Sequence, residues 1–265
     1  MPLDETLSIG ILGAASIAKK NSRAASHPSA GCKIVAIASR SKEKGEAFVA
    51  EVFADAPSAA PVVIGGDSAY STLLDDESCE AIYIPLPTKL HGAYVNDALG
   101  SGKHVLLEKP VASSAEEYRQ MLVTASRNGR LLMDGTMFVH HPRTKEFVKS
   151  IPSPTRVHFN FEFLGGRDFH LNDIRTKMDG DFMGCIGDLG WYCARMGLLV
   201  FSGSDAGLLN GLVTHVQVTR HQLNDQGVPV DAECIVYFKE VRHFVPSIRV
   251  SRDHLFQLTF RPCRE

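Results

Sequence analysis

The sequence predicts an α/β protein in which a doubly wound parallel sheet is followed by an incomplete α/β domain with an open, mostly antiparallel sheet. Three observations support this fold class. Short apolar runs alternate with segments of helical period through the first half of the chain. A glycine turn follows the first of these runs. Later runs alternate apolar and polar residues, as strands with one buried face do.

The first half contains six predicted strands, and helical patterns separate most of them, which indicates parallel pairing with helices on both faces of the sheet. The predicted strands are Leu7–Leu12, Lys33–Ala38, Val62–Ile64, Ala81–Ile84, His104–Leu107 and Arg130–Met133. We therefore expect a first domain at residues 1–138 and a second domain at residues 139–265, atypical from residue 239.

Composition limits the possible partners. With 265 residues, of which 44% are hydrophobic, the chain can bury two ordinary cores. A formal net charge of -2 provides no basic field for nucleic acid or an acidic membrane. No apolar run approaches the roughly 18 residues of a membrane-spanning helix. We expect a small-molecule partner, with no nucleic acid and no membrane.

The cysteines and the N-terminus bear on the compartment. Six cysteines are scattered without a CxxC spacing, which favours reduced thiols over disulfides or a metal site. The first strand begins by Leu7, which leaves no room for a signal peptide. We expect a cytoplasmic protein without a metal.

The turn after the first strand reads G-x-A-x-x-A from Gly13 to Ala18. It follows a strand and opens a helix, which is the context of the dinucleotide fingerprint of a Rossmann domain. Gly13 suits the tight turn, and Ala15, Ser16 and Ile17 would present the amino end of the helix to a pyrophosphate. An ordinary strand-to-helix turn is the alternative reading.

The end of the second strand indicates which dinucleotide binds. An NAD site usually has an acidic residue about 20 positions after the glycines, whereas a 2′-phosphate requires a cation. Residues 28–42 contain no acidic residue and end in Ser39, Arg40, Ser41 and Lys42. This favours NADP over NAD, with Ser39 and Arg40 at the 2′-phosphate. A solvated turn is the alternative.

The fourth strand ends in a loop with two prolines. Pro85, Leu86 and Pro87 form a rigid segment that we expect to lie over the cofactor, and His91 follows at the start of a helix. The alternative is that the prolines simply terminate the strand, and a histidine in this position more often caps or packs than reacts.

The fifth strand is followed by Glu108, Lys109 and Pro110. Their position is the carboxyl edge of the parallel sheet, where open α/β folds bind ligands. Proline fixes its own φ and restricts the residue before it, so the Lys109 ammonium is held in place. This favours Lys109 as a functional residue over a solvated turn.

The Gly13 turn, the Pro85–Pro87 loop with His91, and Glu108-Lys109-Pro110 resemble, in order and spacing, the glucose-fructose oxidoreductase and inositol dehydrogenase (Gfo/Idh/MocA) family, most of all its dihydrodiol dehydrogenase branch. The resemblance covers residues 7 to about 238. It implies a Rossmann domain, then an α/β domain that covers the active site and often forms dimers, so we expect a homodimer if the second domain folds. It also implies a catalytic lysine at Lys109 and a cofactor contact at Glu108.

The second domain is predicted from weaker patterns. We expect strands at Thr155–Phe163, Gly211–Arg220 and Val230–Phe238, a helix at Thr144–Lys149, and a long polar loop at residues 165–187. After Phe238 the resemblance stops, and residues 239–265 do not continue the expected strands. The chain looks cut short or altered there.

The family resemblance also places substrate residues in this domain. His141 and Arg143, after the last Rossmann strand, and Arg175, in the long loop, are candidates for substrate binding; the alternative for the first two is a polar helix start. Asp188 and Tyr192 match an Asp-x-Gly-x-Tyr signature whose last position exchanges a proton. Their spacing of four places both on one helix face, so the carboxylate would orient the phenol. Alternatively, Asp188 caps the helix and Tyr192 packs.

These features predict an NADP-dependent dehydrogenase or reductase that transfers a hydride between the nicotinamide and a carbinol or carbonyl carbon of a sugar or cyclic dihydrodiol. Lys109, Tyr192 and Asp188 are the predicted catalytic residues. Free tyrosine is a poor base at neutral pH, and a nearby ammonium favours its phenolate. The sequence does not show whether Lys109 or Tyr192 transfers the proton. The alternative is a cofactor-binding regulator or inactive relative.

Overall fold

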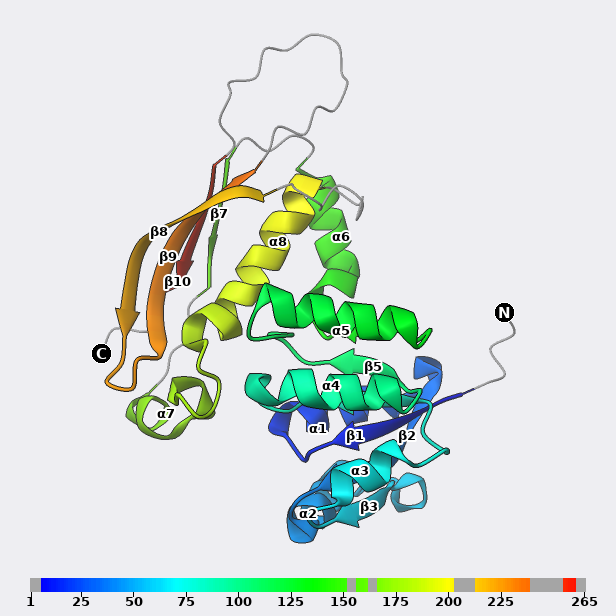
Figure 1. Cartoon of the computed structure of the whole chain (residues 1–265). Coiled ribbons are helices and arrows are strands. Elements are labelled where there is room, and N and C mark those ends of the chain that lie inside the picture. The colour runs from blue at the N-terminus through cyan, green and yellow to red at the C-terminus, as the bar shows by residue number, and fades with distance from the viewer. Residues whose placement is uncertain (1–5, 152–155, 162–165, 203–212, 239–254, 261–265) are drawn as a thin grey trace. The chain divides into compact units, whose positions relative to one another are not determined.

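The structure, a computed structural model, describes residues 6–151, 156–161, 166–202, 213–238 and 255–260. The chain divides into two compact units, Met1–Gly135 and Thr136–Glu265. Figure 1 shows the elements of both units, which are described separately below.

The first unit contains a six-stranded, fully parallel sheet in the order β3-β2-β1-β4-β5-β6. The strands are β1 Leu7–Leu12, β2 Cys32–Ser39, β3 Val62–Gly65, β4 Ala81–Ile84, β5 His104–Leu107 and β6 Leu132–Asp134. This is the strand order of a Rossmann fold, in which the direction of winding reverses between β1 and β4. The predicted parallel sheet is confirmed, and the predicted strand ends differ from these by two residues or fewer.

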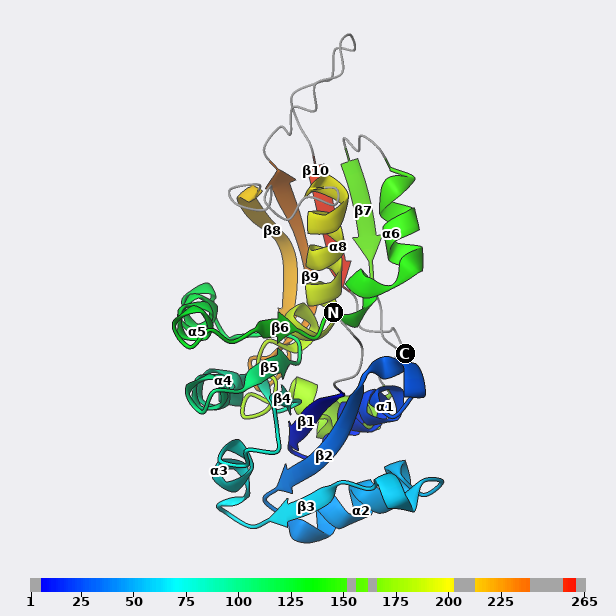
Figure 2. The same ribbon diagram turned by 90° about the vertical axis from the view of Figure 1, so that its right-hand side faces the viewer.

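Helices cover both faces of this sheet. They are α1 Ser16–Ala25, α2 Lys42–Val52, α3 Ala69–Leu74, α4 His91–Gly100 and α5 Ala115–Arg127, with short 3-10 turns η1 Pro28–Ala30, η2 Pro57–Ala59 and η3 Thr88–Leu90. Figure 2 shows α1 and α2 on one face and α3, α4 and α5 on the other. The central strands β1 and β4 are therefore mostly buried, as parallel strands covered on both faces are.

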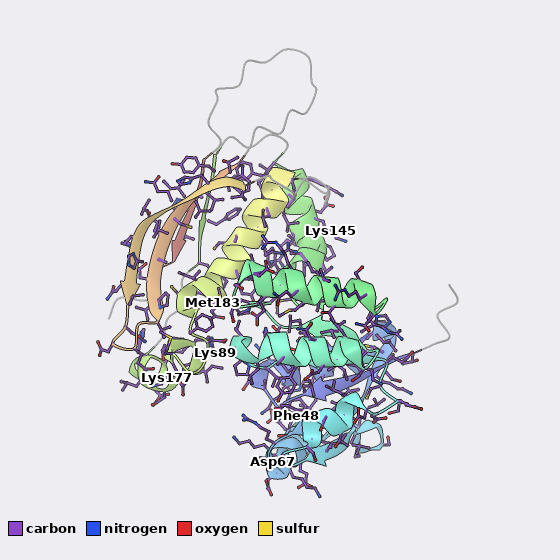
Figure 3. All side chains as sticks on the ribbon, in the orientation of Figure 1. Phe48, Asp67, Lys89, Lys145, Lys177 and Met183 are labelled. Carbon is purple, nitrogen blue, oxygen red and sulfur yellow. The ribbon has the colours of Figure 1, made fainter. Side chains whose placement is uncertain are left out.

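The core of the first unit follows from this layering. On the face covered by α1 and α2, Ile11 and Ile37 of the sheet pack with Phe48 of α2, which is labelled in Figure 3. On the other face, Leu73 of α3 and Leu99 of α4 are fully buried. Burying side chains of this size contributes roughly 1.5–3 kcal/mol each. This packing gives the loops at the strand ends a rigid base.

The second unit contains a four-stranded sheet in the order β7-β10-β9-β8. Its strands are β7 Arg156–Asn160, β8 Val213–Leu223, β9 Pro229–Phe238 and β10 Leu255–Phe260. β9 pairs antiparallel with both β8 and β10, whereas β10 pairs parallel with β7. The expected mostly antiparallel sheet is confirmed.

The helical segments of the second unit are η4 Met137–His140, α6 Pro142–Lys149, α7 Arg167–Asn172, η5 Ile174–Thr176, the π-helical turn η6 Ile186–Gly190, and α8 Trp191–Ser202. The core of this unit joins Cys193 and Phe201 of α8 to Val236 and Phe238 of β9. The rings of Phe201 and Phe238 stack with their centroids 4.3 Å apart. Thus α8 is held on the sheet by these apolar side chains.

Two expectations for the second unit need correction, and a third is only partly covered by the described residues. The segment after residue 238 does contribute a strand, because β10 inserts between β7 and β9. The expected long loop is not simply irregular, since it contains α7 and η5. The strand expected at Thr155–Phe163 is described only as Arg156–Asn160, and Thr155 and residues 162–165 lie outside the described residues.

Candidate functional site

The predicted cofactor residues lie at one edge of the first sheet. Neighbouring strands β2, β1, β4 and β5 are parallel, so their carboxyl ends meet at the same edge. The loops that follow these ends contain, in this order across the sheet, Ser39 and Arg40, Gly13, Pro85 to Pro87, and Glu108 with Lys109. The switch point between β1 and β4 is where folds of this type bind their ligands.

The turn after β1 requires glycine. Gly13 has a φ of 97°, in the left-handed region that side chains disfavour. Its amide donates a 2.7 Å hydrogen bond to the Ala38 carbonyl at the end of β2. A Cβ atom at Gly13 would lie 3.0 Å from Cδ2 of Leu86, so the loop after β4 packs directly against this turn.

The amino end of α1 follows two residues later. Ala15 is the N-cap residue, with φ of -74° and ψ of 152°, and it makes no side-chain capping bond. Ser16, which begins the helix, is exposed, and Ile17 is half-buried. The first N–H groups of a helix lack partners within the helix, so an uncapped start suits an anionic group such as a pyrophosphate.

The segment after β2 contains the predicted 2′-phosphate residues. Ser39 is buried at the strand end, and Arg40 is exposed. Ser41 caps α2 by accepting a 3.2 Å hydrogen bond from the Lys44 amide. Lys42 faces Glu46 of the same helix at 3.8 Å. Arg40 is the guanidinium at this strand end, and it also interacts with the Tyr70 hydroxyl.

Tyr70 joins these two segments, and we did not single it out in the sequence. Its hydroxyl would lie 3.5 Å from a Cβ atom at Gly13, and its ring packs edge-on against Tyr94 with centroids 5.1 Å apart. Burial raises the pKa of Tyr70, and the nearby Arg40 charge opposes that rise. No spacing in the sequence relates α3 to the Gly13 turn.

A buried network surrounds the carboxylate of Glu108. The Tyr83 hydroxyl donates a 2.6 Å hydrogen bond to Glu108 Oε1, and the Asn21 amide donates to the same oxygen at 3.2 Å. The Asn21 amide also lies 2.6 Å from the Tyr83 oxygen. Burial, together with the charge of Glu108, raises the pKa of Tyr83 well above its usual range, so this phenol stays protonated. The network joins α1, β4 and the segment after β5.

Lys109 follows this anchored glutamate. Its side chain is half-buried, and its backbone N–H points at Glu108 Oε2 across 3.3 Å. The next residue, Pro110, is buried, and the peptide bond between them is cis. Lys109 is therefore held between a buried carboxylate and a buried proline, as predicted from the Glu-Lys-Pro sequence. Neither Tyr83 nor Asn21 was foreseen as part of that support.

His91 is packed against the loop that follows β4. The side chain is 0% exposed. Its Nε2 lies 2.7 Å from the Leu86 carbonyl oxygen, and its Nδ1 lies 3.2 Å from the Val111 carbonyl oxygen. This placement favours support of the loops over direct contact with a cofactor.

In the second unit, Arg175 lies between two carboxylates. Its Nε donates to Asp173 Oδ1 at 2.9 Å, and its Nη1 donates to Asp188 Oδ2 at 3.3 Å. The guanidinium also lies 5.3 Å from the centre of the Phe169 ring. Burial acts to lower the pKa of Arg175, but the charges of Asp188 and Asp173 outweigh it and raise that pKa.

Tyr192 begins the first turn of α8. Its hydroxyl lies 3.8 Å from the Met137 sulfur, and its ring lies 5.8 Å from that of Phe138 and 5.7 Å from that of Phe161. The preceding residues form the π-helical turn that contains Asp188. A π-helical turn is wider than an α-helical one, so the helix between Asp188 and Tyr192 is not a regular α-helix from its start.

His141 and Arg143 are both exposed at the start of α6. The His141 ring accepts a 3.1 Å hydrogen bond from the Arg143 amide and so caps the helix. Within the described residues no group of three or more histidines, cysteines or acidic residues could hold a metal ion. No helix in that part of the chain is long and apolar enough to cross a membrane.

Residues 7–136 match the sequence model of the GFO_IDH_MocA oxidoreductase family, described as having an NAD-binding Rossmann fold. Together, the fold and this match define a protein with a Rossmann domain of the kind found in a family of oxidoreductases. The chain belongs to the Gfo/Idh/MocA oxidoreductase family, as the sequence motifs predicted.

Two curated relatives extend into the second unit. A dTDP-3,4-didehydro-2,6-dideoxy-alpha-D-glucose 3-reductase from Saccharopolyspora spinosa is 30% identical over 86% of this chain and 64% of its own length. A D-xylose 1-dehydrogenase (NADP(+)) from Haloferax volcanii is 32% identical over 83% of this chain and 62% of its own length. The chain thus spans less than two thirds of the length of both relatives.

Solved structures agree with this assignment. A 3-ketoreductase from Actinomadura kijaniata in complex with NADP and TDP-benzene superposes with a TM-score of 0.71 and 25% identity, covering 97% of this chain and 70% of that one. A gentamicin A biosynthesis protein in complex with NAD gives a TM-score of 0.76 at 18% identity, covering 98% of this chain and 67% of that one, and shares the fold.

Proposed function

We propose that the chain forms the cofactor-binding and much of the substrate-binding part of an NADP-dependent oxidoreductase that acts on a CH–OH or carbonyl carbon of a sugar. The observation that carries this proposal is Lys109, which is fixed between a buried glutamate and a buried proline at the sheet edge that also bears the Gly13 turn. The named activities of the relatives support a sugar substrate, and cyclic dihydrodiols remain the second substrate class to assay.

Different residues of the first unit bind different parts of the cofactor. The Gly13 turn and the uncapped start of α1 hold the pyrophosphate, while Arg40 binds the 2′-phosphate and thereby selects NADP. Leu86, which packs on Gly13, covers the cofactor. When bound, the nicotinamide supplies or accepts the hydride.

The chemistry at the substrate oxygen falls to Lys109 and Tyr192 in this proposal. Hydride transfer from a carbinol carbon leaves an alkoxide unless the hydroxyl proton departs as well. The Lys109 ammonium stabilises the charge on that oxygen, and the Tyr192 phenol exchanges the proton. Arg175, held by Asp188, together with His141 and Arg143, would contact the sugar hydroxyls.

An activity panel tests this function. The purified protein is incubated with NADP and pentoses, hexoses, nucleotide-linked sugars or dihydrodiols, and NADPH absorbance is followed. We expect Lys109→Met and Tyr192→Phe each to lower turnover by about 10²-fold or more while NADP affinity stays within a few fold.

Matched controls are Lys145→Met, at an exposed lysine of α6, and Tyr94→Phe, at a half-buried tyrosine of α4. Both should retain turnover. Normal turnover in both Lys109→Met and Tyr192→Phe would remove the catalytic assignment. NADP binding without turnover on any substrate would favour a cofactor-binding regulator.

A further inference from the structure

His91 connects two loops of the candidate site through its two ring nitrogens. One nitrogen faces the Leu86 carbonyl in the loop after β4, and the other faces the Val111 carbonyl in the loop after β5. The ring is fully buried, so it has no surface for a ligand to contact. Whatever His91 contributes must therefore act through these two loops.

Each of these two contacts connects His91 to a different part of the candidate site. Leu86 presses on the Gly13 turn, where an added Cβ would lie 3.0 Å from its side chain. Val111 follows Lys109 and Pro110 directly in sequence, and Pro110 allows little backbone rotation between them. Movement of the first carbonyl would shift the cofactor cover, and movement of the second would shift the Lys109 ammonium.

Each of the two contacts is favourable only if the ring nitrogen donates a hydrogen bond to the carbonyl. A carbonyl oxygen accepts hydrogen bonds and never donates, so each contact requires an N–H on the nitrogen that faces it. A neutral ring has one N–H and donates it to one carbonyl at a time, so the tautomer decides which of the two loops it binds. Val111 is buried and Leu86 is half-buried, so a carbonyl that loses its donor there is costly, which ties the loops to this side chain.

We propose that His91 is a positioning residue that sets the cofactor cover through the Leu86 carbonyl and, separately, the Lys109 ammonium through the Val111 carbonyl. This inference rests on the proposed function for its kinetic consequence. It goes beyond that function by assigning two separable effects to one buried side chain.

Two substitutions separate the effects. The amide nitrogen of glutamine lies as many bonds from Cα as Nε2 of histidine, so His91→Gln has an N–H group that can face Leu86 and none that can face Val111. The amide nitrogen of asparagine corresponds in the same way to Nδ1, so His91→Asn retains the donor for Val111. His91→Phe removes both donors.

The two variants should therefore differ in which parameter changes, kcat or NADP affinity. We expect His91→Gln to lower kcat by about tenfold with NADP affinity nearly unchanged, since one lost hydrogen bond corresponds to roughly that factor. We expect His91→Asn to weaken NADP binding by about tenfold and to retain kcat at saturating NADP. His91→Phe should show both losses.

Backbone amide NMR provides a readout that needs neither turnover nor cofactor. Shift changes should concentrate at Lys109, Val111 and Ala112 in His91→Gln, and at Leu86 and Thr88 in His91→Asn. The control is His104→Gln, because His104 starts β5 at the opposite edge of the sheet, where its ring accepts a hydrogen bond from the Leu131 amide. That variant should disturb neither loop.

Outcomes for this inference are distinct from those for the proposed function. If the parent protein shows no turnover on any substrate, the proposed function fails, while the amide shifts and the NADP titration still test His91. If His91→Gln and His91→Asn disturb the same loop and the same parameter, or if neither disturbs any, the positioning role of His91 is wrong.

Discussion

Arg40 is a single exposed side chain that we propose selects the cofactor. Its neighbours Ser41 and Lys42 are engaged with α2, so Arg40 is the cation that we expect to meet a 2′-phosphate. We predict that NADP binds at least about tenfold more tightly than NAD, which corresponds to about 1.4 kcal/mol. Fluorescence titration of both cofactors should show that Arg40→Ala removes most of this preference and that Lys42→Ala retains it. Equal affinities in the parent protein would contradict the assignment.

Tyr83 should affect stability, because its hydroxyl donates a hydrogen bond to the buried carboxylate of Glu108. Removing the hydroxyl leaves Glu108 Oε1 with the Asn21 amide as its remaining described donor in the network. We predict that Tyr83→Phe lowers the free energy of unfolding by about 1–3 kcal/mol, the usual cost of an unsatisfied buried polar group. Urea denaturation measures this, with Tyr94→Phe as the control. A change below about 0.5 kcal/mol would show that the network contributes little stability.

Among the elements, the turn from β1 to α1 should tolerate an added side chain poorly. Gly13 and Gly31 both have positive φ, at 97° and 64°, but only Gly13 has a side chain, that of Leu86, within 3.0 Å of an added Cβ. Gly31 has nothing within 4 Å. We predict that Gly13→Ala and Gly31→Ala each lower the free energy of unfolding by about 1–2 kcal/mol, the cost of left-handed backbone.

Cofactor affinity should separate these two variants. Only Gly13→Ala displaces Leu86 and adds a methyl group at the cofactor turn, so only that variant should bind NADP more weakly. Isothermal titration of both variants measures the difference. Similar losses of affinity in Gly13→Ala and Gly31→Ala would show that the turn acts through stability alone.

For the whole molecule, the two compact units should respond differently to cofactor. Each unit has its own apolar core, and the predicted cofactor residues all lie within Met1–Gly135. A ligand that binds one folded unit stabilises that unit by mass action. The residues of β8, in contrast, are exposed throughout the strand, which lies at the edge of its sheet.

We therefore predict that limited proteolysis with NADP yields a resistant fragment from the first half of the chain, and that the second half is cut first. Mass spectrometry of the digests with and without NADP identifies the fragments. Equal resistance of both halves, unaffected by NADP, would contradict this division.

The sequence by itself determined the parallel sheet and the edge that bears the predicted cofactor residues. Alternating apolar runs and helical segments are local patterns, and consecutive parallel strands place their carboxyl ends together whatever the details of packing. For the same reason, Gly13, Arg40 and Lys109 could be assigned to one edge before any contact was known. Their proposed roles still depend on the experiments described above.

Tertiary structure alone decided the contacts between residues that are distant in the chain. The hydrogen bonds from Asn21 and Tyr83 to Glu108 join three elements, and the two carbonyls at His91 belong to loops that no spacing relates. The strand β10 was missed for the same reason, because its pairing with β7 and β9 depends on partners far along the chain. Local propensity specifies elements, whereas packing and hydrogen bonding between elements specify which side chains support the site.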